Sequence, residues 1–407
     1  MKEENNTVTP ILKPLWSAVL AVALAVAGLI TSEFLPVSML TPMARDLRIT
    51  EGVAGQAISI TAIMGMVASL LVPSFTKQIN RRWVLLAFGL LQILSNLVVA
   101  YSPNFALLLT GRVLLGIGLG GFWSMAAATA TRLVPKELIP KALSIIFGAV
   151  SVATVVAAPM GSYLGEHIGW RNVFLIAAAL GVIAFIAQAV SLPSMPTGKA
   201  AKLGDLLKVL KRPYIKAGMW ATMFVFIGYA TFFTYLRPFL EVVSGVNANT
   251  LSTILLGFGI ANLMGTSLAR YLLEWNIFRS LTIAPLLMGI IVTGLVFAGQ
   301  ITMLASILVA AWGMVFGVVQ VGWTDWLTRT IPDELESGGG IQIAVIQLGI
   351  TAGAAVGGFI FDLAGTKGVF LSSSIFTLFA ALIAMMAFRK QARRSLQRSP
   401  ENMSVVL

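Results

Sequence analysis

The chain has 407 residues, of which 57% are hydrophobic and 11% charged, with a formal net charge of +12 and no cysteine. A protein surrounded only by water would need more polar side chains than this to cover its surface, so the chain requires lipid as a solvent. The lack of cysteine excludes a disulfide framework and a thiolate metal site. The basic residues lie in short loops rather than along one aromatic-laced face, so nucleic acid is not an expected partner, whereas anionic membrane lipid is.

Apolar stretches follow one another along the whole chain, each near the roughly 20 residues that cross a hydrocarbon core as a helix. Alternation with a period of two is absent, which favours helices over a transmembrane barrel. The first stretch is too long for the apolar region of a signal peptide and is predicted to be a retained helix. We predict twelve transmembrane helices, at 16–40, 52–76, 83–101, 105–131, 138–165, 171–191, 215–240, 248–270, 277–298, 301–324, 338–362 and 367–388.

Lys and Arg concentrate in alternate loops on the side of the N-terminus, which predicts that both termini lie in the cytoplasm. The longest polar interruption, 192–213, is rich in Pro and Lys and is predicted to be a cytoplasmic linker. It divides an N-terminal six-helix bundle at 1–191 from a C-terminal six-helix bundle at 214–388, followed by a basic cytoplasmic tail at 389–407.

An internal repeat supports this division. Helices four and five of the predicted set match helices ten and eleven when the chain is shifted by 197 residues. Two parallel halves related by an axis along the membrane normal are expected to hold a substrate site between them, near the middle of the bilayer. The matching residues are Gly116 with Gly313, Gly120 with Gly317, Arg132 with Arg329, Pro135 with Pro332, Glu137 with Glu334, and Ala157, Ala158 and Gly161 with Ala354, Ala355 and Gly358.

Two helical motifs carry a family resemblance. The segment GRVLLGIGLGGFW at 111–123 is similar to the Arg-bearing helix-four motif of the major facilitator superfamily, and GAVSVATVVAAPMGSYLG at 148–165 resembles the proline-glycine signature of its antiporters. Ala158 replaces the usual Gly of that signature, and Lys77 stands where the loop motif at 73–82 normally has Asp. The resemblance implies an all-α membrane protein of two pseudo-symmetric six-helix bundles that works by alternating access.

Further segments are similar to the drug and sugar proton antiporters, and among these to the bacterial purine ribonucleoside exporters. They include SEFLPVSMLTPMARDL at 32–47, VGWTDWLTR at 321–329 and GIQIAVIQL at 340–348. The resemblance implies a monomeric inner-membrane exporter of nucleosides such as inosine and guanosine, in exchange for protons and without a cofactor. Sugar or multidrug efflux is the alternative. ATP-driven transport and enzymatic activity are not expected, because the chain lacks a GxxxxGK motif followed by Ser or Thr and any conventional catalytic or metal-binding constellation.

Two charged residues are predicted to couple transport to protons. Glu33 is the only carboxylate deep within a first-half stretch, and an ionised carboxylate there costs about 2.5–3.5 kcal/mol by insertion scales. A carboxyl whose charged partner moves can bind and release a proton during a transport cycle. Arg112 shares one helical face with Gly116, Gly120 and Trp123 and is the expected partner. The alternatives are a permanent ion pair or a water-exposed position for Glu33, and a fixed charge that locks helices for Arg112.

Aromatic and amide side chains at helical spacing are predicted to bind the substrate. A purine has flat faces that stack on aromatic rings and edges that amides can recognise. Aromatic stripes also occur as ordinary packing, and amides also join transmembrane helices to one another. Gln342 and Gln347 are five residues apart, so both cannot face one cavity. The candidate residues are Trp123, Tyr229, Phe233, Asn262, Phe316, Gln320, Trp323, Gln342 and Gln347.

Overall fold

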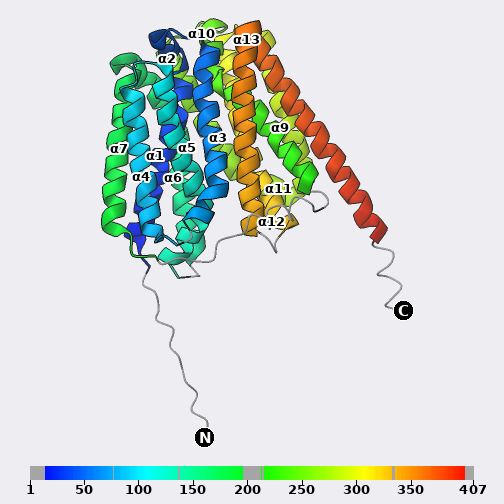
Figure 1. Cartoon of the computed structure of the whole chain (residues 1–407). Helices are drawn as coiled ribbons and strands as arrows, with labels where there is room; N and C mark the ends of the chain where they lie inside the picture. Colours follow the sequence, from blue (N-terminus) through cyan, green and yellow to red (C-terminus); the bar gives the residue numbers. More distant parts are fainter. Residues whose placement is uncertain are drawn as a thin grey trace, which may run out of the picture.

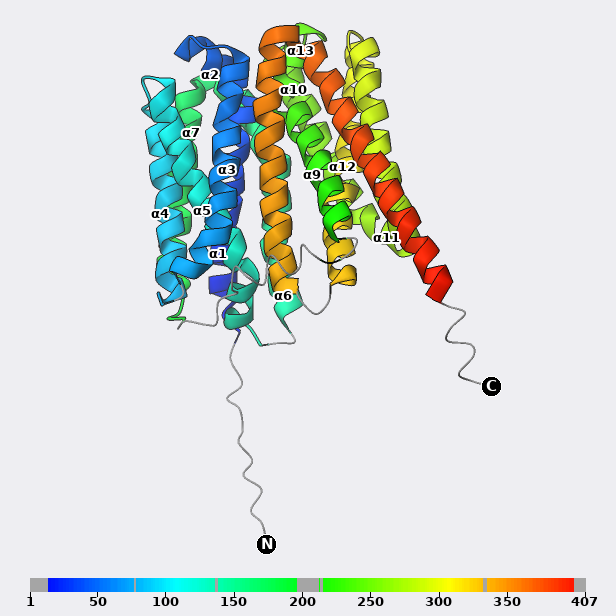
Figure 2. The same ribbon diagram turned by 45° about the vertical axis from the view of Figure 1, so that its right-hand side comes forward.

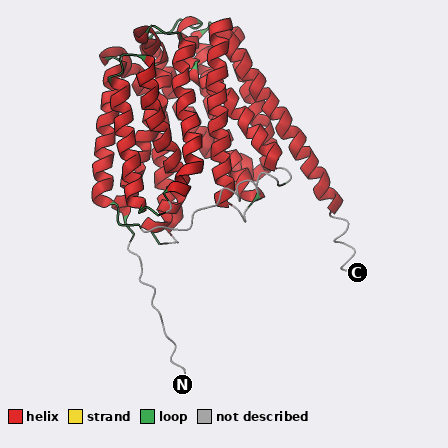
Figure 3. Ribbon diagram, in the orientation of Figure 1, coloured by secondary structure: helices red, strands yellow, loops and turns green. Residues whose placement is uncertain are grey.

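The computed structural model describes residues 14–76, 78–135, 138–195, 212, 215–331 and 335–398, and its regular elements there are helices (Figure 3). Most of the predicted linker and the end of the predicted tail lie outside the described residues. Large apolar side chains are exposed on the outside of the helices, including Val190 at 82% and Phe297 at 80%. Such exposure is expected where lipid is the solvent. The prediction of an all-helical membrane protein is confirmed.

The first half of the chain forms antiparallel helices joined by short connections. Asn and Thr side chains cap several of them: Thr50, Asn80 and Asn104 accept hydrogen bonds from main-chain N–H groups two or three residues further on. The helices are α1 (Trp16–Ser38), α2 (Leu40–Leu47), α3 (Glu51–Phe75), α4 (Arg81–Ala100), α5 (Phe105–Leu133), α6 (Ile139–Ile168) and α7 (Trp170–Ser191).

The second half contains two long helical elements, each of which consists of two helices joined at a kink. The first element has 51 residues, and its kink is a residue of extended backbone, Asn276. The second has 64 residues and is interrupted at Gly365, where φ is +65°. The helices are α9 (Ile215–Thr234), α10 (Leu236–Val242), α11 (Ala248–Ala298), α12 (Thr302–Thr330) and α13 (Leu335–Arg398).

Ten helices in the described part of the chain are long and apolar enough to cross a membrane. The predicted stretches 248–270 and 277–298 both fall within α11, and 338–362 and 367–388 both fall within α13. The interruptions at Asn276 and Gly365 lie between the members of these pairs. The predicted boundaries of the remaining spans lie close to those of the observed helices, except that α12 continues to Thr330.

The first helix of each half is broken near one end. The sequence predicts continuous helices there, at 16–40 and 215–240. The breaks lie at Met39 and Tyr235, where ψ is 16° and 13°. Pro42 and Pro238 each follow three residues later and have no N–H to donate to the carbonyl groups of Ser38 and Thr234. The free Ser38 carbonyl accepts a hydrogen bond from the Arg237 guanidinium of the other half.

The two halves of the chain lie next to each other and meet along two pairs of helices. In Figures 1 and 2 the blue-to-green helices stand on one side and the green-to-red helices on the other. Contacts between them join α3 to α13 and α6 to α11. At the end near α2 and α10 the contact is tight: a Cβ on Gly52 would lie 2.5 Å from the Gly358 carbonyl oxygen, and the Tyr235 hydroxyl is 3.5 Å from the Gly52 carbonyl oxygen. The halves are therefore closed against each other at that end.

Candidate functional site

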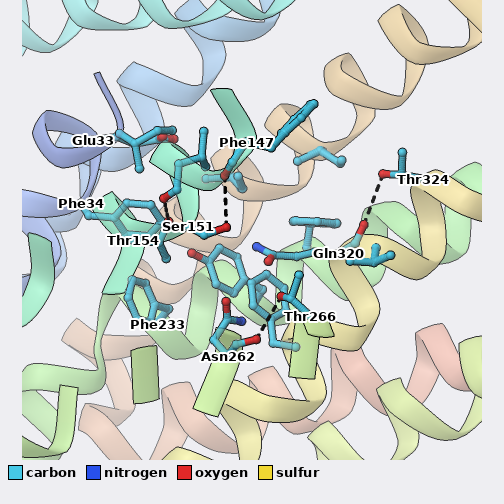
Figure 4. Close-up of a pocket in the computed structure, with 18 of the residues that line it drawn as sticks. Glu33, Phe34, Phe147, Ser151, Thr154, Phe233, Asn262, Thr266, Gln320 and Thr324 are labelled. Carbon is cyan, nitrogen blue, oxygen red and sulfur yellow. Dashed lines mark hydrogen bonds between the residues drawn. The ribbon is translucent and has the colours of Figure 1, made fainter. Parts of the chain in front are cut away.

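A cavity of about 630 Å³ lies between the two halves (Figure 4). Its walls come from α1, α3, α5 and α6 of the first half and from α9, α11, α12 and α13 of the second. Pockets that bind small molecules are mostly apolar with a few well-placed polar groups, and their volume is typically about 300–1,000 Å³. The cavity has the size and lining of a small-molecule site.

Glu33 lies on α1 and lines the cavity, on the same helical face as Ile30 and next to Phe34 (Figure 4). It is the only acidic residue within the 23 residues of α1. A carboxylate at this depth faces the water and solute that enter the cavity rather than lipid. The position suits a group that exchanges a proton with the cavity.

Arg112 is fully buried behind the cavity wall and joins three helices. Its Nη1 donates to the Ser32 carbonyl at 2.9 Å, and its Nε donates to the Thr61 hydroxyl at 3.0 Å. Its Nη2 lies 3.5 Å from the main-chain carbonyl of Glu33. Among the described residues, its hydrogen bonds go to carbonyl and hydroxyl groups of α1 and α3, and none goes to the Glu33 carboxylate. Arg112 thus holds the helix that carries Glu33 while the carboxylate is left to the cavity.

Aromatic rings form one wall of the cavity. Tyr229 stacks on Phe316 with ring centroids 4.1 Å apart and an interplanar angle of 5°. Phe233 stacks on Tyr229 at 5.5 Å, and Phe34 meets Phe233 edge to face at 5.6 Å. These contacts tie rings from α1, α9 and α12 together into one packed wall. On the first-half side, Trp123 stacks on Phe147 at 5.7 Å.

Six of the nine predicted substrate-binding residues line the cavity: Trp123, Tyr229, Phe233, Asn262, Phe316 and Gln320. Asn262 donates from Nδ2 to the Gly313 carbonyl at 3.0 Å, which fixes its amide between α11 and α12. Gln320 is exposed within the cavity. The single helix α12 therefore supplies both a stacking surface and an amide.

The other three predicted residues lie outside the cavity lining. Trp323 is buried and meets Trp326 edge to face at 5.6 Å. Gln347 packs against α3, where its Nε2 lies 2.6 Å from the position of a Cβ on Gly65. Gln342 is buried on α13. The rotation of each helix about its axis decides these positions, and it is set by the neighbouring helices.

Several lining residues were not predicted from the sequence. Phe147, Ser151 and Thr154 follow each other on α6 at spacings of four and three residues, which places them on one face. This spacing was available in the sequence. The spacing of the polar residues at the end of α12 was also available in the sequence. The predicted span there, 301–324, ended one residue before Asp325. The missed polar residues are Ser151, Thr154, Thr234, Thr266, Thr324, Asp325 and Thr328.

The described residues contain no group of three or more His, Cys, Asp or Glu side chains that could hold a metal ion. The site instead offers aromatic faces, hydroxyl and amide groups, and a carboxylate, within a set of membrane-spanning helices. The helices and the cavity between the two halves together have the form of a multi-pass membrane transport protein.

Comparison with known proteins identifies the family. The family model "Major Facilitator Superfamily" matches residues 20–339. The chain belongs to the major facilitator superfamily. It is 45% identical over 390 residues to the purine ribonucleoside efflux pump NepI of Escherichia coli strain K12, covering 96% of this chain and 98% of that protein. The NepI protein of Shigella flexneri is similar to the same extent.

Solved structures show the same fold. The crystal structure of a D-xylose-proton symporter superposes with a TM-score of 0.76 at 15% identity, covering 91% of this chain and 97% of that one. A bacterial homologue of the human lysosomal transporter Spinster, in an inward-facing and unoccupied conformation, superposes with a TM-score of 0.75 at 13% identity, covering 92% and 97% of the two chains.

Proposed function

We propose that the protein exports purine ribonucleosides such as inosine and guanosine in exchange for protons, by alternating access. The observation that carries this proposal is the 45% identity, across nearly the whole of both chains, to proteins named as purine ribonucleoside efflux pumps. The cavity supports it, because stacked rings suit a purine base, and amide and hydroxyl groups suit its edges and its ribose.

The proposed membrane arrangement has twelve spans in two six-helix halves, with α11 and α13 each crossing twice. Each of these elements consists of two helices joined at a kink, and each of the joined helices is long enough to cross a bilayer. The halves then comprise 1–191 and 214–388, joined by the segment 192–213. By the positive-inside rule both termini lie in the cytoplasm, and the membrane is a bacterial inner membrane. We further propose that the protein works as a monomer, because each chain contains both halves and the cavity between them.

In this arrangement the cavity opens toward the cytoplasm. The contacts near α2 and α10, from Tyr235 to Gly52 and from Arg237 to Ser38, close the opposite, periplasmic end. Thr324 and Thr328, near the C-terminal end of α12, are exposed and line the cavity. A nucleoside enters from this side and leaves after the halves rock about the cavity.

Proton entry supplies enough free energy for this export. A pH difference of one unit provides about 1.4 kcal/mol per proton, and 100 mV of membrane potential adds about 2.3 kcal/mol. A neutral nucleoside carries no opposing charge. One proton therefore sustains a solute gradient of roughly several hundred-fold, and a membrane potential alone is expected to drive transport.

Everted membrane vesicles test the proposed function. Uptake of labelled inosine, arabinose and a cationic dye is measured with and without an imposed proton gradient. We expect inosine to accumulate, and accumulation to collapse when a protonophore is added. Preferential accumulation of arabinose or the dye would replace this proposal with sugar or multidrug efflux.

A further inference from the structure

Four polar residues of the cavity lining, Gln320, Thr324, Asp325 and Thr328, lie on the last turns of α12. Thr324 and Glu33 are well separated in Figure 4, with the aromatic Phe233 on the Glu33 side. Nine residues separate Phe316 from Asp325, or about 13–14 Å along the helix. The cavity thus offers a stacking surface at one level of α12 and polar groups at another, a spacing comparable to the long dimension of a nucleoside.

Hydroxyl groups of the cavity lining are placed to accept hydrogen bonds from a solute. Two of them donate to a carbonyl group of their own helix: Ser151 to Phe147 at 3.1 Å and Thr324 to Gln320 at 3.2 Å. Thr154, Thr266 and Thr328 do the same at 2.8–3.0 Å. A hydroxyl whose proton is committed still has a lone pair to offer. A solute with several donors, such as the hydroxyl groups of a sugar, satisfies these lone pairs.

Asp325 is the strongest of these acceptors. It lines the cavity with a side chain that is 28% exposed, and the guanidinium group of Arg329 contacts both of its oxygens, at 3.0 Å from Nε to Oδ1 and 2.7 Å from Nη2 to Oδ2. A carboxylate has about four lone-pair sites, so each oxygen can accept one more hydrogen bond. Two hydroxyl donors on adjacent carbons match two such acceptors.

The internal repeat indicates that the fold does not require this carboxylate. Arg329 matches Arg132 of the first half at an offset of 197 residues, whereas Asp325 matches Ala128. An ion pair four residues apart on a partly exposed helix face also contributes little to the stability of that helix. The basic residue is thus common to both halves, and the carboxylate belongs to the half whose helix carries the polar part of the cavity.

We propose that Asp325 is a specificity-determining residue that accepts hydrogen bonds from the 2′- and 3′-hydroxyls of the ribose, with the base lying toward Tyr229 and Phe316. This rests on the proposed function, because the ribose belongs to the proposed solute. Asp325 thereby discriminates ribonucleosides from deoxyribonucleosides and from free bases, which lack one or both of these donors.

The test compares solutes that differ by single hydroxyls. Binding of inosine, 2′-deoxyinosine and 3′-deoxyinosine to the purified full-length protein is measured by calorimetry, for the native protein and for Asp325→Asn. A hydrogen bond to a charged group predicts that the native protein binds inosine about tenfold or more tightly than either deoxynucleoside. In Asp325→Asn we expect inosine, which loses two charged hydrogen bonds, to weaken the most and each deoxynucleoside, which keeps one of the two hydroxyls, to weaken less, so that the affinity ratios narrow toward one.

Glu274→Gln is the matched control, because Glu274 forms the same kind of pair with Arg270 on α11, where the carboxylate is 57% exposed and outside the cavity lining. It is expected to leave all three affinities unchanged. Asp325→Glu keeps the charge and is expected to retain more discrimination than Asn. If a variant cannot be purified, competition of each deoxynucleoside against labelled inosine in vesicles measures the same ratios.

The outcomes separate this inference from the proposed function. If the native protein binds no purine nucleoside, both are wrong. If it binds inosine but Asp325→Asn weakens all three nucleosides by the same factor, or leaves the ratios unchanged, the assignment to Asp325 alone is overturned.

Discussion

Helices α5 and α12 occupy matching positions in the two halves, and they share glycines at the helix contacts but differ where they face the cavity. Their glycines serve the same purpose: a Cβ on Gly120 would lie 2.0 Å from the Gly65 carbonyl oxygen, and one on Gly317 would lie 2.2 Å from that of Asn262. In contrast, Trp123 of α5 matches Gln320 of α12 at the offset of 197 residues, and both line the cavity. Matching positions of the two halves therefore share close helix packing but differ in the side chains that they present to the cavity.

The same comparison shows that the buried charge of Arg112 has no counterpart at the matching position of the second half. Arg112 matches Val309, and both are fully buried. The breaks at Met39 and Tyr235 align the first helices of the halves at an offset of 196 residues, so Glu33 matches Tyr229. We infer that proton coupling belongs to the first half, through Glu33 and Arg112, while polar solute recognition belongs largely to the second. Four predictions test this division.

The largest effect is expected for Glu33→Gln, which keeps nearly the same shape but cannot titrate. Proton-driven accumulation of inosine in everted vesicles should be abolished. Exchange of labelled for unlabelled inosine without a proton gradient should continue, because it requires alternating access but no net proton movement. Glu166→Gln, at an exposed carboxylate on α6, is the control and should behave as the native protein. Accumulation driven by a pH difference in Glu33→Gln would remove Glu33 from proton coupling.

Arg112→Ala should have the next largest effect. It removes the hydrogen bonds that hold Ser32 and Thr61, so the helix that carries Glu33 loses its support. We expect proton-driven accumulation to fall at least about tenfold, and the melting temperature of the purified protein to fall with it. Arg112→Lys should restore only part of both, because an ammonium group cannot reproduce the planar guanidinium contacts. Native transport by the Ala variant, at equal expression, would exclude a coupling role.

Because the two halves pack their helices in the same way, the third prediction is that matching glycine substitutions lower the melting temperature in both halves. Gly120→Ala and Gly317→Ala each place a methyl group against main-chain atoms that cannot move aside easily. Overpacking of this kind costs about 1–3 kcal/mol, so both variants should melt at lower temperature than the native protein. Gly257→Ala on α11 is the matched control, because no atom lies within 4 Å of its added Cβ. A large effect in one half only would contradict equivalent packing.

Much of this fold follows from the sequence, because lipid requires each span to satisfy its own hydrogen bonds and to be apolar. The breaks at Met39 and Tyr235 were not predicted, although Pro42 and Pro238 remove a helical hydrogen bond at matching positions. A sequence shows which carbonyl group is left free, but not that Arg237 of the other half donates to it. That contact depends on how the halves pack.

Less of the candidate site than of the fold could be predicted from the sequence. Glu33 could be singled out because a carboxylate within an apolar helix is costly. Gln320 and Gln347 were equally plausible from their chemistry, yet one lines the cavity and the other packs against α3. Asp325 was missed because it follows the predicted end of a span, where charged residues are common. Periodicity gives the spacing of side chains around a helix, and only the neighbouring helices fix which side faces the cavity.

The smallest expected effect distinguishes the two glutamines. Gln320→Ala removes an exposed amide from the cavity wall, and a hydrogen bond to a neutral group contributes about 0.5–1.5 kcal/mol. Inosine affinity measured by calorimetry should therefore fall by about twofold to tenfold. Gln347→Ala should leave inosine affinity unchanged, and any cost should fall on stability, because its amide packs at the contact between α13 and α3. If Gln347→Ala weakens inosine binding more than Gln320→Ala does, the solute lies against α13 instead. The polar recognition assigned to α12, including that by Asp325, would then have to be reconsidered.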